Sequence, residues 1–220
     1  MANKTNNEPI TRVNGKAKEI LFQSMDLIMK NLKHNMEHLN KPKYFSHTQK
    51  FIELIHNGLV NKRKFFLLAS GRSAFILQCF ATRLVHLGAE VYMITNLASM
   101  PALTKNDVLI VLSGSGTTAI VVSLLKNYVN TVKPYGIVTI TSHPETIIGR
   151  VGDITIKLKG RTKRDIGRVD RDHTDTAVLT PEGTQFEIAA FVYLDAIIAE
   201  LAIKLGKTNE DLLKKHSESV

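Results

Sequence analysis

The stretch "DVLIVLSGSGTTAIVVSLL" (107–125) combines a short apolar run, a turn and the start of a helical pattern. The run at 107–112 is the right length for a strand and has almost no polar positions, which is typical of a strand covered on both faces of a parallel sheet. Serine, glycine and threonine follow at 113–118, and apolar residues at helical spacing continue to about residue 130. This order predicts one strand–turn–helix unit.

Four more apolar runs, at 65–69, 90–94, 136–141 and 153–158, repeat the pattern, with a second clear helix over 73–87. Short strands that alternate with helices indicate a parallel sheet. We therefore predict an α/β fold with a doubly wound five-stranded parallel sheet in the flavodoxin-like order 2-1-3-4-5, flanked by helices. Two amphipathic helices are expected before it, over 16–39 and, beyond the break at Pro42, 45–59. A polar loop (159–183), a long helix (184–205) and a short final helix follow.

The 220 residues suit one domain, and we expect it to span the whole chain. Its expected parts are a flexible start at 1–15, two leading helices at 16–60, the sheet core at 65–158 and C-terminal helices at 184–216. Apolar runs are too short for a membrane span, and the N-terminus lacks the apolar core of a signal peptide. The single cysteine, Cys79, excludes an intrachain disulfide and is expected to be buried. A cytoplasmic protein without a membrane partner is the expectation.

The net charge of +9 is unevenly distributed, because residues 1–64 carry 12 Lys and Arg against 5 Asp and Glu. A nucleic-acid-binding protein would be expected to combine a basic stripe with a reading motif and aromatic stacking residues. The sequence has no tryptophan and no such motif, so a nucleic-acid partner is not expected. A small anionic substrate fits the basic balance equally well.

Two loops, "ASGRSA" (69–74) and "SGSGTT" (113–118), follow the first and third predicted strands. In the order 2-1-3-4-5 these loops meet at the crevice where the winding reverses. Each could be an ordinary turn with a hydroxyl N-cap, but two such loops at helix starts favour a phosphate site. The candidates are Ser70, Gly71, Ser73, Ser113, Ser115, Thr117 and Thr118. Neither GxxxxGK[ST] nor GxGxxG is present, so a small phosphorylated metabolite is favoured over a nucleotide.

Glu187 and two histidines are the candidates for proton transfer. Glu187 is either the last residue of a capping box with Thr184 or a base that reaches the crevice. His86 ends a predicted helix, where a C-terminal cation is the alternative to catalysis, and His216 lies in the polar tail. His143 is expected to be a loop residue. No metal-ligand spacing is present, so neither a metal nor another cofactor is expected.

The stretches "ASGRSAFILQCFATRLVHLGAEVYMI", "VLIVLSGSGTT", "LKGRTKRD" and "EGTQFEIAAFVYLDAIIAEL" together resemble the sugar isomerase (SIS) domain family. Within it they are most similar to the 6-phospho-3-hexuloisomerases, and the likeness covers nearly the whole chain. It implies interconversion of D-arabino-hex-3-ulose 6-phosphate and D-fructose 6-phosphate in the ribulose monophosphate pathway. It also implies a homotetramer with sites at subunit contacts.

The resemblance further implies roles for individual residues. Ser73, Ser113, Ser115 and Thr118 would hold the phosphate, and Glu187 would be the base of a cis-enediolate proton transfer without a cofactor. His86 and His216 both match histidines of the family, and His216 would reach the site from a neighbouring subunit. Ala69, Ala74 and Thr117 depart from the family pattern, and the loop that ends near residue 183 is longer. An isomerase of another phosphosugar and a non-catalytic sugar-phosphate-binding module therefore remain alternatives.

Overall fold

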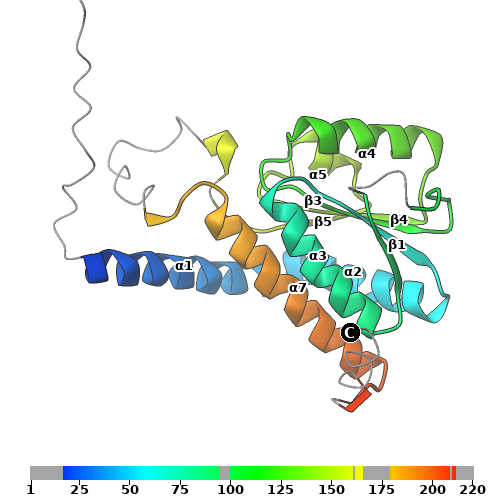
Figure 1. The fold of residues 1–220 in the computed structure, drawn as a ribbon, viewed down its shortest axis with the longest axis horizontal. Coiled ribbons are helices and arrows are strands. Elements are labelled where there is room, and N and C mark those ends of the chain that lie inside the picture. Colours follow the sequence, from blue (N-terminus) through cyan, green and yellow to red (C-terminus); the bar gives the residue numbers. More distant parts are fainter. Residues whose placement is uncertain (1–16, 95–99, 161, 166–178, 209, 212–220) are drawn as a thin grey trace, which may run out of the picture.

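The computed structural model describes residues 17–94, 100–160, 162–165, 179–208 and 210–211. Five strands form one parallel sheet in the order β2-β1-β3-β4-β5 (Figure 1). This confirms the predicted fold class and strand order. The sheet and its connecting helices are β1 (Lys64–Leu68), α3 (Arg72–His86), β2 (Glu90–Met93), β3 (Val108–Leu112), α4 (Ala119–Thr131), β4 (Gly136–Thr141), α5 (Ile147–Val151) and β5 (Ile154–Lys157).

β1 lies in the interior of the sheet and pairs on both sides. Phe66 lies beside Tyr92 of β2 on one side and beside Leu109 of β3 on the other. After β1 the chain goes out to β2, and it then returns across β1 to form β3. The winding direction therefore reverses between β1 and β3, and the loops that follow these two strands diverge there.

Helices cover both faces of the sheet. Successive side chains of β1 point to opposite faces of the sheet and belong to two different apolar clusters. Phe65 and Leu67 belong to the first cluster, and Phe66 and Leu68 belong to the second. The first cluster includes residues of α2 (Pro42–Val60), α3 and α7 (Thr184–Lys204), and the second includes residues of α4 and α5. Because β1, β3 and β4 are buried on both faces, they show apolar runs rather than alternation.

Two leading helices are present as predicted, α1 (Ala17–Leu39) and α2, although α2 begins earlier than expected. We predicted that Pro42 interrupts the helical pattern and that the helix begins near Phe45. Pro42 instead occupies the first turn of α2. A proline is favoured there, since the first helical N–H has no partner to lose. α1 packs against α7 and extends beyond it at the edge of the molecule (Figure 1).

The prediction that Cys79 is buried is wrong. The buried side of α3 carries Leu77, Phe80 and Leu84, and Cys79 lies on the other side of the helix, where it is exposed. The expected flexible start at 1–15 and nearly all of the short final helix lie outside the described residues. None of the helices described here is long and apolar enough to cross a bilayer.

Candidate active site

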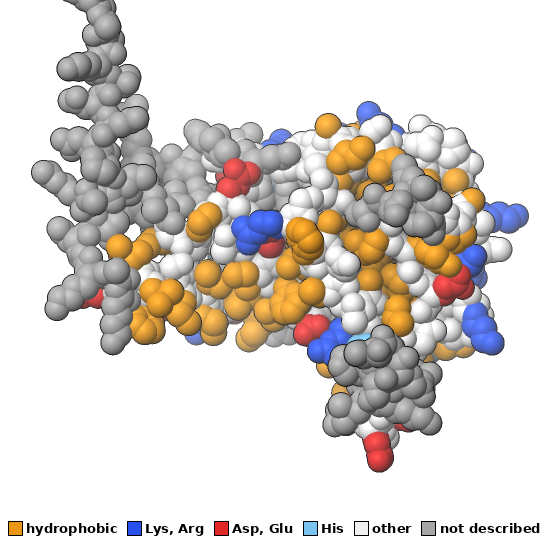
Figure 2. Space-filling model, in the orientation of Figure 1, with side chains coloured by type: hydrophobic (Ala, Val, Ile, Leu, Met, Phe, Trp, Pro, Cys, Tyr) orange, Lys and Arg blue, Asp and Glu red, His pale blue; other side chains and the backbone are white. Residues whose placement is uncertain are grey.

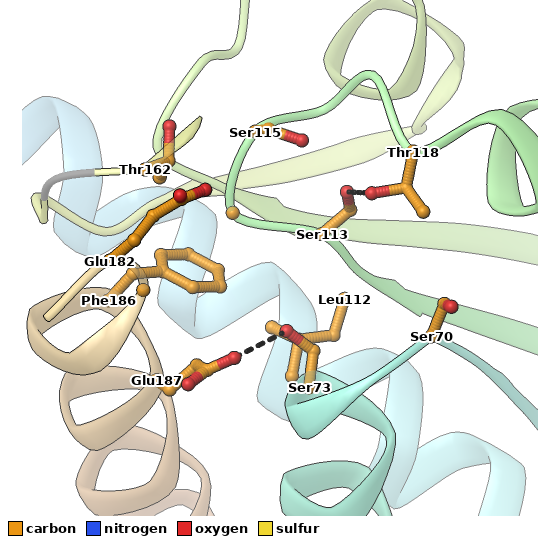
Figure 3. A pocket seen from close by; sticks show the side chains of 12 residues that line it. Ser70, Ser73, Leu112, Ser113, Ser115, Thr118, Thr162, Glu182, Phe186 and Glu187 are labelled. Carbon is orange, nitrogen blue, oxygen red and sulfur yellow. Dashed lines mark hydrogen bonds between the residues drawn. The ribbon is translucent and has the colours of Figure 1, made fainter. Parts of the chain in front are cut away.

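Hydroxyl side chains from two separate loops line one pocket of about 160 Å³ (Figure 3). Ser70 and Ser73 come from the loop after β1 and the start of α3. Ser113, Ser115 and Thr118 come from the loop after β3. The structure thus brings five of the seven predicted phosphate-binding residues to the crevice between β1 and β3. Their role in binding phosphate stays a prediction.

The loop after β3 is held in shape by a glycine and by the end of β4. Gly116 has a φ of +63°, and a Cβ there would lie 2.1 Å from the Thr146 hydroxyl oxygen. The Gly114 carbonyl accepts hydrogen bonds from the Ser142 N–H at 3.1 Å and from the Thr141 hydroxyl at 3.2 Å. These contacts leave the Ser113 and Thr118 hydroxyl oxygens 3.4 Å apart in the pocket.

Three helices begin at this pocket, since Ser73, Thr118 and Gly183 line it at the starts of α3, α4 and α7. The first N–H groups of a helix have no partner within it, and its dipole gives that end a positive character. Together with the hydroxyls, three such ends can hold an anion such as a phosphate group.

Glu187 faces the pocket from the first turn of α7 and is buried (Figure 3). Its Oε1 accepts a hydrogen bond from the Ser73 hydroxyl at 3.4 Å. Arg72 Nε lies 3.0 Å from Oε2 and forms an ion pair that lacks hydrogen-bond alignment. Among the described residues no donor makes a hydrogen bond to this oxygen, which is buried and has the Arg72 guanidinium as its charged neighbour.

Of the two alternatives for Glu187, the capping box with Thr184 is not formed. Gly183, with a φ of +85°, is the N-cap of α7, and Thr184 is already the first helical residue. The Thr184 N–H donates to the Pro181 carbonyl, and no side chain caps the helix. The Glu187 carboxylate is therefore turned toward Ser73 on α3 instead of back to its own helix end.

Burial raises the pKa of Glu187 above the usual value for a glutamate, and the Arg72 charge and the Ser73 hydrogen bond oppose this rise only in part. A carboxylate with a raised pKa is a stronger base than a solvated one, which suits the removal of a proton from carbon. The site thus holds a buried carboxylate next to hydroxyls and helix ends that can fix an anion.

Three of the predicted site residues that the structure describes are not on the pocket wall. Gly71 is the N-cap of α3, with a φ of +61°, and Thr117 is exposed and donates to the Ser115 hydroxyl oxygen. His86 lies at the far end of the 15-residue helix α3, about 20 Å from the pocket by helix length. There it borders a separate cavity with Arg83 and Asp195. His216 lies outside the described residues.

The sequence reasoning missed Thr162, Glu182 and Phe186, which also line the pocket. Thr162 belongs to "LKGRTKRD", which carried the resemblance but no residue role. Its hydroxyl lies 3.0 Å from His143 Nε2 and donates to Asp165 at 2.9 Å. The described part of the chain has no group of three or more His, Cys, Asp or Glu side chains able to hold a metal ion.

Known proteins with similar sequences point to one family. The family model of the SIS domain matches residues 58–167, which contain both hydroxyl loops. A protein of Methanocaldococcus jannaschii named 3-hexulose-6-phosphate isomerase is 29% identical over 190 residues, which are 86% of this chain and 90% of that protein. One of the same name from Methylomonas aminofaciens is 30% identical over 154 residues, 69% of this chain and 78% of that one.

A solved structure with the same fold belongs to a protein linked to the same activity. It is a protein of Methanococcus jannaschii for which the structure was taken to infer 3-hexulose-6-phosphate isomerase function. It superposes with a TM-score of 0.69 at 27% identity, over 88% of this chain and 97% of that one. The family match, these relatives and the shared fold together show that this chain belongs to the SIS domain family, and several of its relatives there are named 3-hexulose-6-phosphate isomerase.

Proposed function

We propose that the protein is a 6-phospho-3-hexuloisomerase, which interconverts D-arabino-hex-3-ulose 6-phosphate and D-fructose 6-phosphate. The observation that carries this proposal is the position of Glu187, a buried carboxylate with a raised pKa, on the wall of the pocket that the hydroxyl loops line. The names of the relatives support the same substrate class.

In this proposal the phosphate group lies against Ser113, Ser115 and Thr118 at the start of α4. The sugar carbons then extend toward Glu187 and Ser73 on the opposite wall (Figure 3). Contacts to the phosphate are remote from the reacting carbons, so they supply binding energy and orientation. The reacting end needs only a base and donors for the oxyanion.

The reaction moves a carbonyl group from C3 to C2. Glu187 takes the proton from C2 of the hexulose, and the C3 carbonyl becomes the oxyanion of a cis-enediolate. The same carboxyl group returns the proton to C3, while the hydroxyl proton on O2 passes to O3 as the C2 carbonyl forms. The Ser73 hydroxyl and the N–H groups at the start of α3, on the same wall as Glu187, serve as donors for the developing charge. No electrons leave the substrate, so no oxidant or reductant is required.

A role for His86 in this step requires a second copy of the chain, because within one chain it lies at the far end of α3. We propose a homotetramer, as the family resemblance implies. Large apolar side chains are exposed along α1 and over α3 and α7 (Figure 2), among them Phe22, Met29, Phe75 and Phe191. Exposed apolar area of this kind marks a protein–protein contact. Light scattering is expected to give four times the chain mass of 24.5 kDa, and the mass of a single chain would contradict the proposal.

Turnover of a panel of phosphosugars tests the function. The purified protein is incubated with D-arabino-hex-3-ulose 6-phosphate in deuterated water, and product formation is followed by ¹³C NMR. We expect D-fructose 6-phosphate carrying solvent deuterium at C3, from exchange on the base. Turnover of a different phosphosugar alone would replace the proposed substrate. Binding of all of them without turnover would identify a sensor and not an enzyme.

An isomerase of another phosphosugar is the second candidate, and Glu182 is the observation that favours it. This exposed carboxylate enters the pocket wall beside Thr162 (Figure 3). A carboxylate there can accept hydrogen bonds from sugar hydroxyls or pair with an amino group, so it can select among substrates. The panel therefore includes amino-sugar phosphates.

Ser113→Ala is expected to raise KM by about tenfold to a hundredfold and to leave kcat nearly unchanged, because a hydrogen bond to a charged phosphate is lost while the base is intact. Steady-state kinetics measure this split. Thr117→Ala is the matched control, since Thr117 belongs to the same loop but lies off the pocket wall. Equal effects of the two substitutions would contradict the assigned phosphate position.

Arg72→Ala is expected to move the acid limb of the pH profile of kcat/KM to higher pH. The Arg72 charge favours the ionised form of Glu187, so its removal raises the pKa of the carboxyl group further. The base must be ionised to act, so the variant is expected to lose activity at a higher pH than the natural protein does when the pH is lowered. Arg72→Lys keeps the positive charge and is expected to move the limb less. An acid limb that stays in place in Arg72→Ala would show that another group titrates there.

A further inference from the structure

The turn between α1 and α2 and the end of β5 carry a group of positive and potentially positive side chains. We call it the basic turn; its members are His34, His38, Lys41, Lys157 and Lys159. Asn35 of α1 joins the two segments, because its side chain accepts from the Lys159 N–H at 2.7 Å and donates to the Lys159 carbonyl at 2.8 Å. None of the five residues lines the pocket that contains Glu187.

His38 lies at the centre of the basic turn and has a side-chain nitrogen without a partner. It is only 4% exposed, and no described residue makes a hydrogen bond to its Nε2. Its ring packs against that of Tyr44 in the first turn of α2, with 3.8 Å between the ring centroids and a tilt of 37° between the ring planes. Burial, and then the charges of Lys159, Lys157 and Lys41, lower its pKa to about 4. Each charged group that acts on His38 is positive.

The lysines of the basic turn form no ion pair with any described residue, whereas Lys30 pairs with Asp26 and Lys204 with Glu53 elsewhere on the helices. The Lys159 ammonium lies 2.7 Å from His34 Nε2. Lys41 is the N-cap of α2, a helix without an acidic residue in its first turn or a side-chain cap. Three lysines without an ion pair among the described residues thus act on His38, and one of them, Lys41, is the N-cap of α2.

We propose that the basic turn is a second anion-binding site, which takes the phosphate group of a small molecule or free inorganic phosphate. The binding charge comes from the ammonium groups, and His38 Nε2 becomes a donor once the anion favours its protonated form. Backbone N–H groups contribute little here. Pro42 has none, and those of Tyr44 and Phe45 already donate to the Lys41 carbonyl.

The test is a titration of the full chain, labelled with ¹⁵N-histidine, with inorganic phosphate at pH 7 and at an ionic strength held constant with chloride. The ring signals of His38 report protonation directly. We expect them to shift toward the imidazolium position and to saturate. Lys157→Ala/Lys159→Ala is expected to raise the phosphate concentration for half-saturation by about tenfold or more. Lys126→Ala/Lys133→Ala, which removes the same charge on and after α4, is the matched control and should leave it unchanged.

Ser113→Ala separates this site from the pocket and is expected to leave the His38 response intact. Loss of the response in Ser113→Ala, an equal response to chloride, or no response to phosphate would each overturn the proposal. A response that grows with protein concentration would indicate that an acidic surface of a second copy binds here. Much tighter binding of an oligonucleotide would indicate a nucleic-acid site. Either outcome would overturn the proposal. A titration with glycerol phosphate distinguishes the two possible ligands. Tighter binding than that of inorganic phosphate would identify a phosphorylated metabolite as the ligand, and weaker binding would identify free phosphate.

Discussion

Glu187→Gln is expected to lower kcat by about three orders of magnitude while the affinity for D-fructose 6-phosphate changes by only a few-fold. Glutamine has nearly the same shape and can still accept a hydrogen bond from the Ser73 hydroxyl, so the pocket is kept. It cannot take a proton from carbon at neutral pH, so the chemical step is lost. Steady-state kinetics give kcat, and calorimetry with the product gives the affinity.

Deuterium exchange gives an independent readout of the same variant. The natural protein is expected to exchange the C3 hydrogen of D-fructose 6-phosphate with solvent deuterium, and Glu187→Gln is not. Glu200→Gln is the matched control, because Glu200 lies on the same helix but is exposed near its other end. It should keep normal kcat and exchange. Near-normal turnover in Glu187→Gln would show that a different group is the base.

The sheet could be predicted because its strands have a strong local signal. Val108–Leu112 is buried at every position, so the whole run is apolar, and the turn residues at 113–118 mark its end. Topology then follows from rules that do not depend on side-chain detail, and it brings the loops at 70 and 113 together. Helix α5, with five residues, is too short to show a helical period, and it was not predicted.

The details of the site depend on contacts between elements that are distant in the sequence. The pattern Thr184-x-x-Glu187 matches a capping box, but Gly183 occupies the N-cap with a left-handed backbone, and this displaces the pattern by one residue. The pairing of Arg72 with Glu187 joins α3 to α7, and no local pattern reveals it. The same holds for Glu182, which enters the wall of the pocket only because α7 begins there.

Gly160→Ala is expected to lower kcat by about a hundredfold and to destabilise the fold by about 1–3 kcal/mol, although Gly160 carries no chemical group. A Cβ at this position would lie 2.4 Å from the Phe186 backbone nitrogen and 2.7 Å from its Cα, and backbone atoms cannot rotate away. Leu158 is fully buried and the Lys159 backbone is hydrogen-bonded to Asn35, so the displacement falls on the first turn of α7. That turn carries Glu187, and a shift of about 1 Å is enough to misplace a base.

Calorimetric melting and steady-state kinetics, measured on the same preparation, separate this effect from a loss of folded protein. Gly206→Ala is the control, since Gly206 has a φ of +64° just beyond the other end of α7 and no atom within 4 Å of its Cβ position. It is expected to lose some stability through backbone strain and to keep kcat. If Gly160→Ala melts lower but turns over normally, α7 does not depend on this contact for its position. Together with Glu187→Gln, which should lose turnover without a comparable loss of stability, the pair distinguishes the base from the contact that positions it.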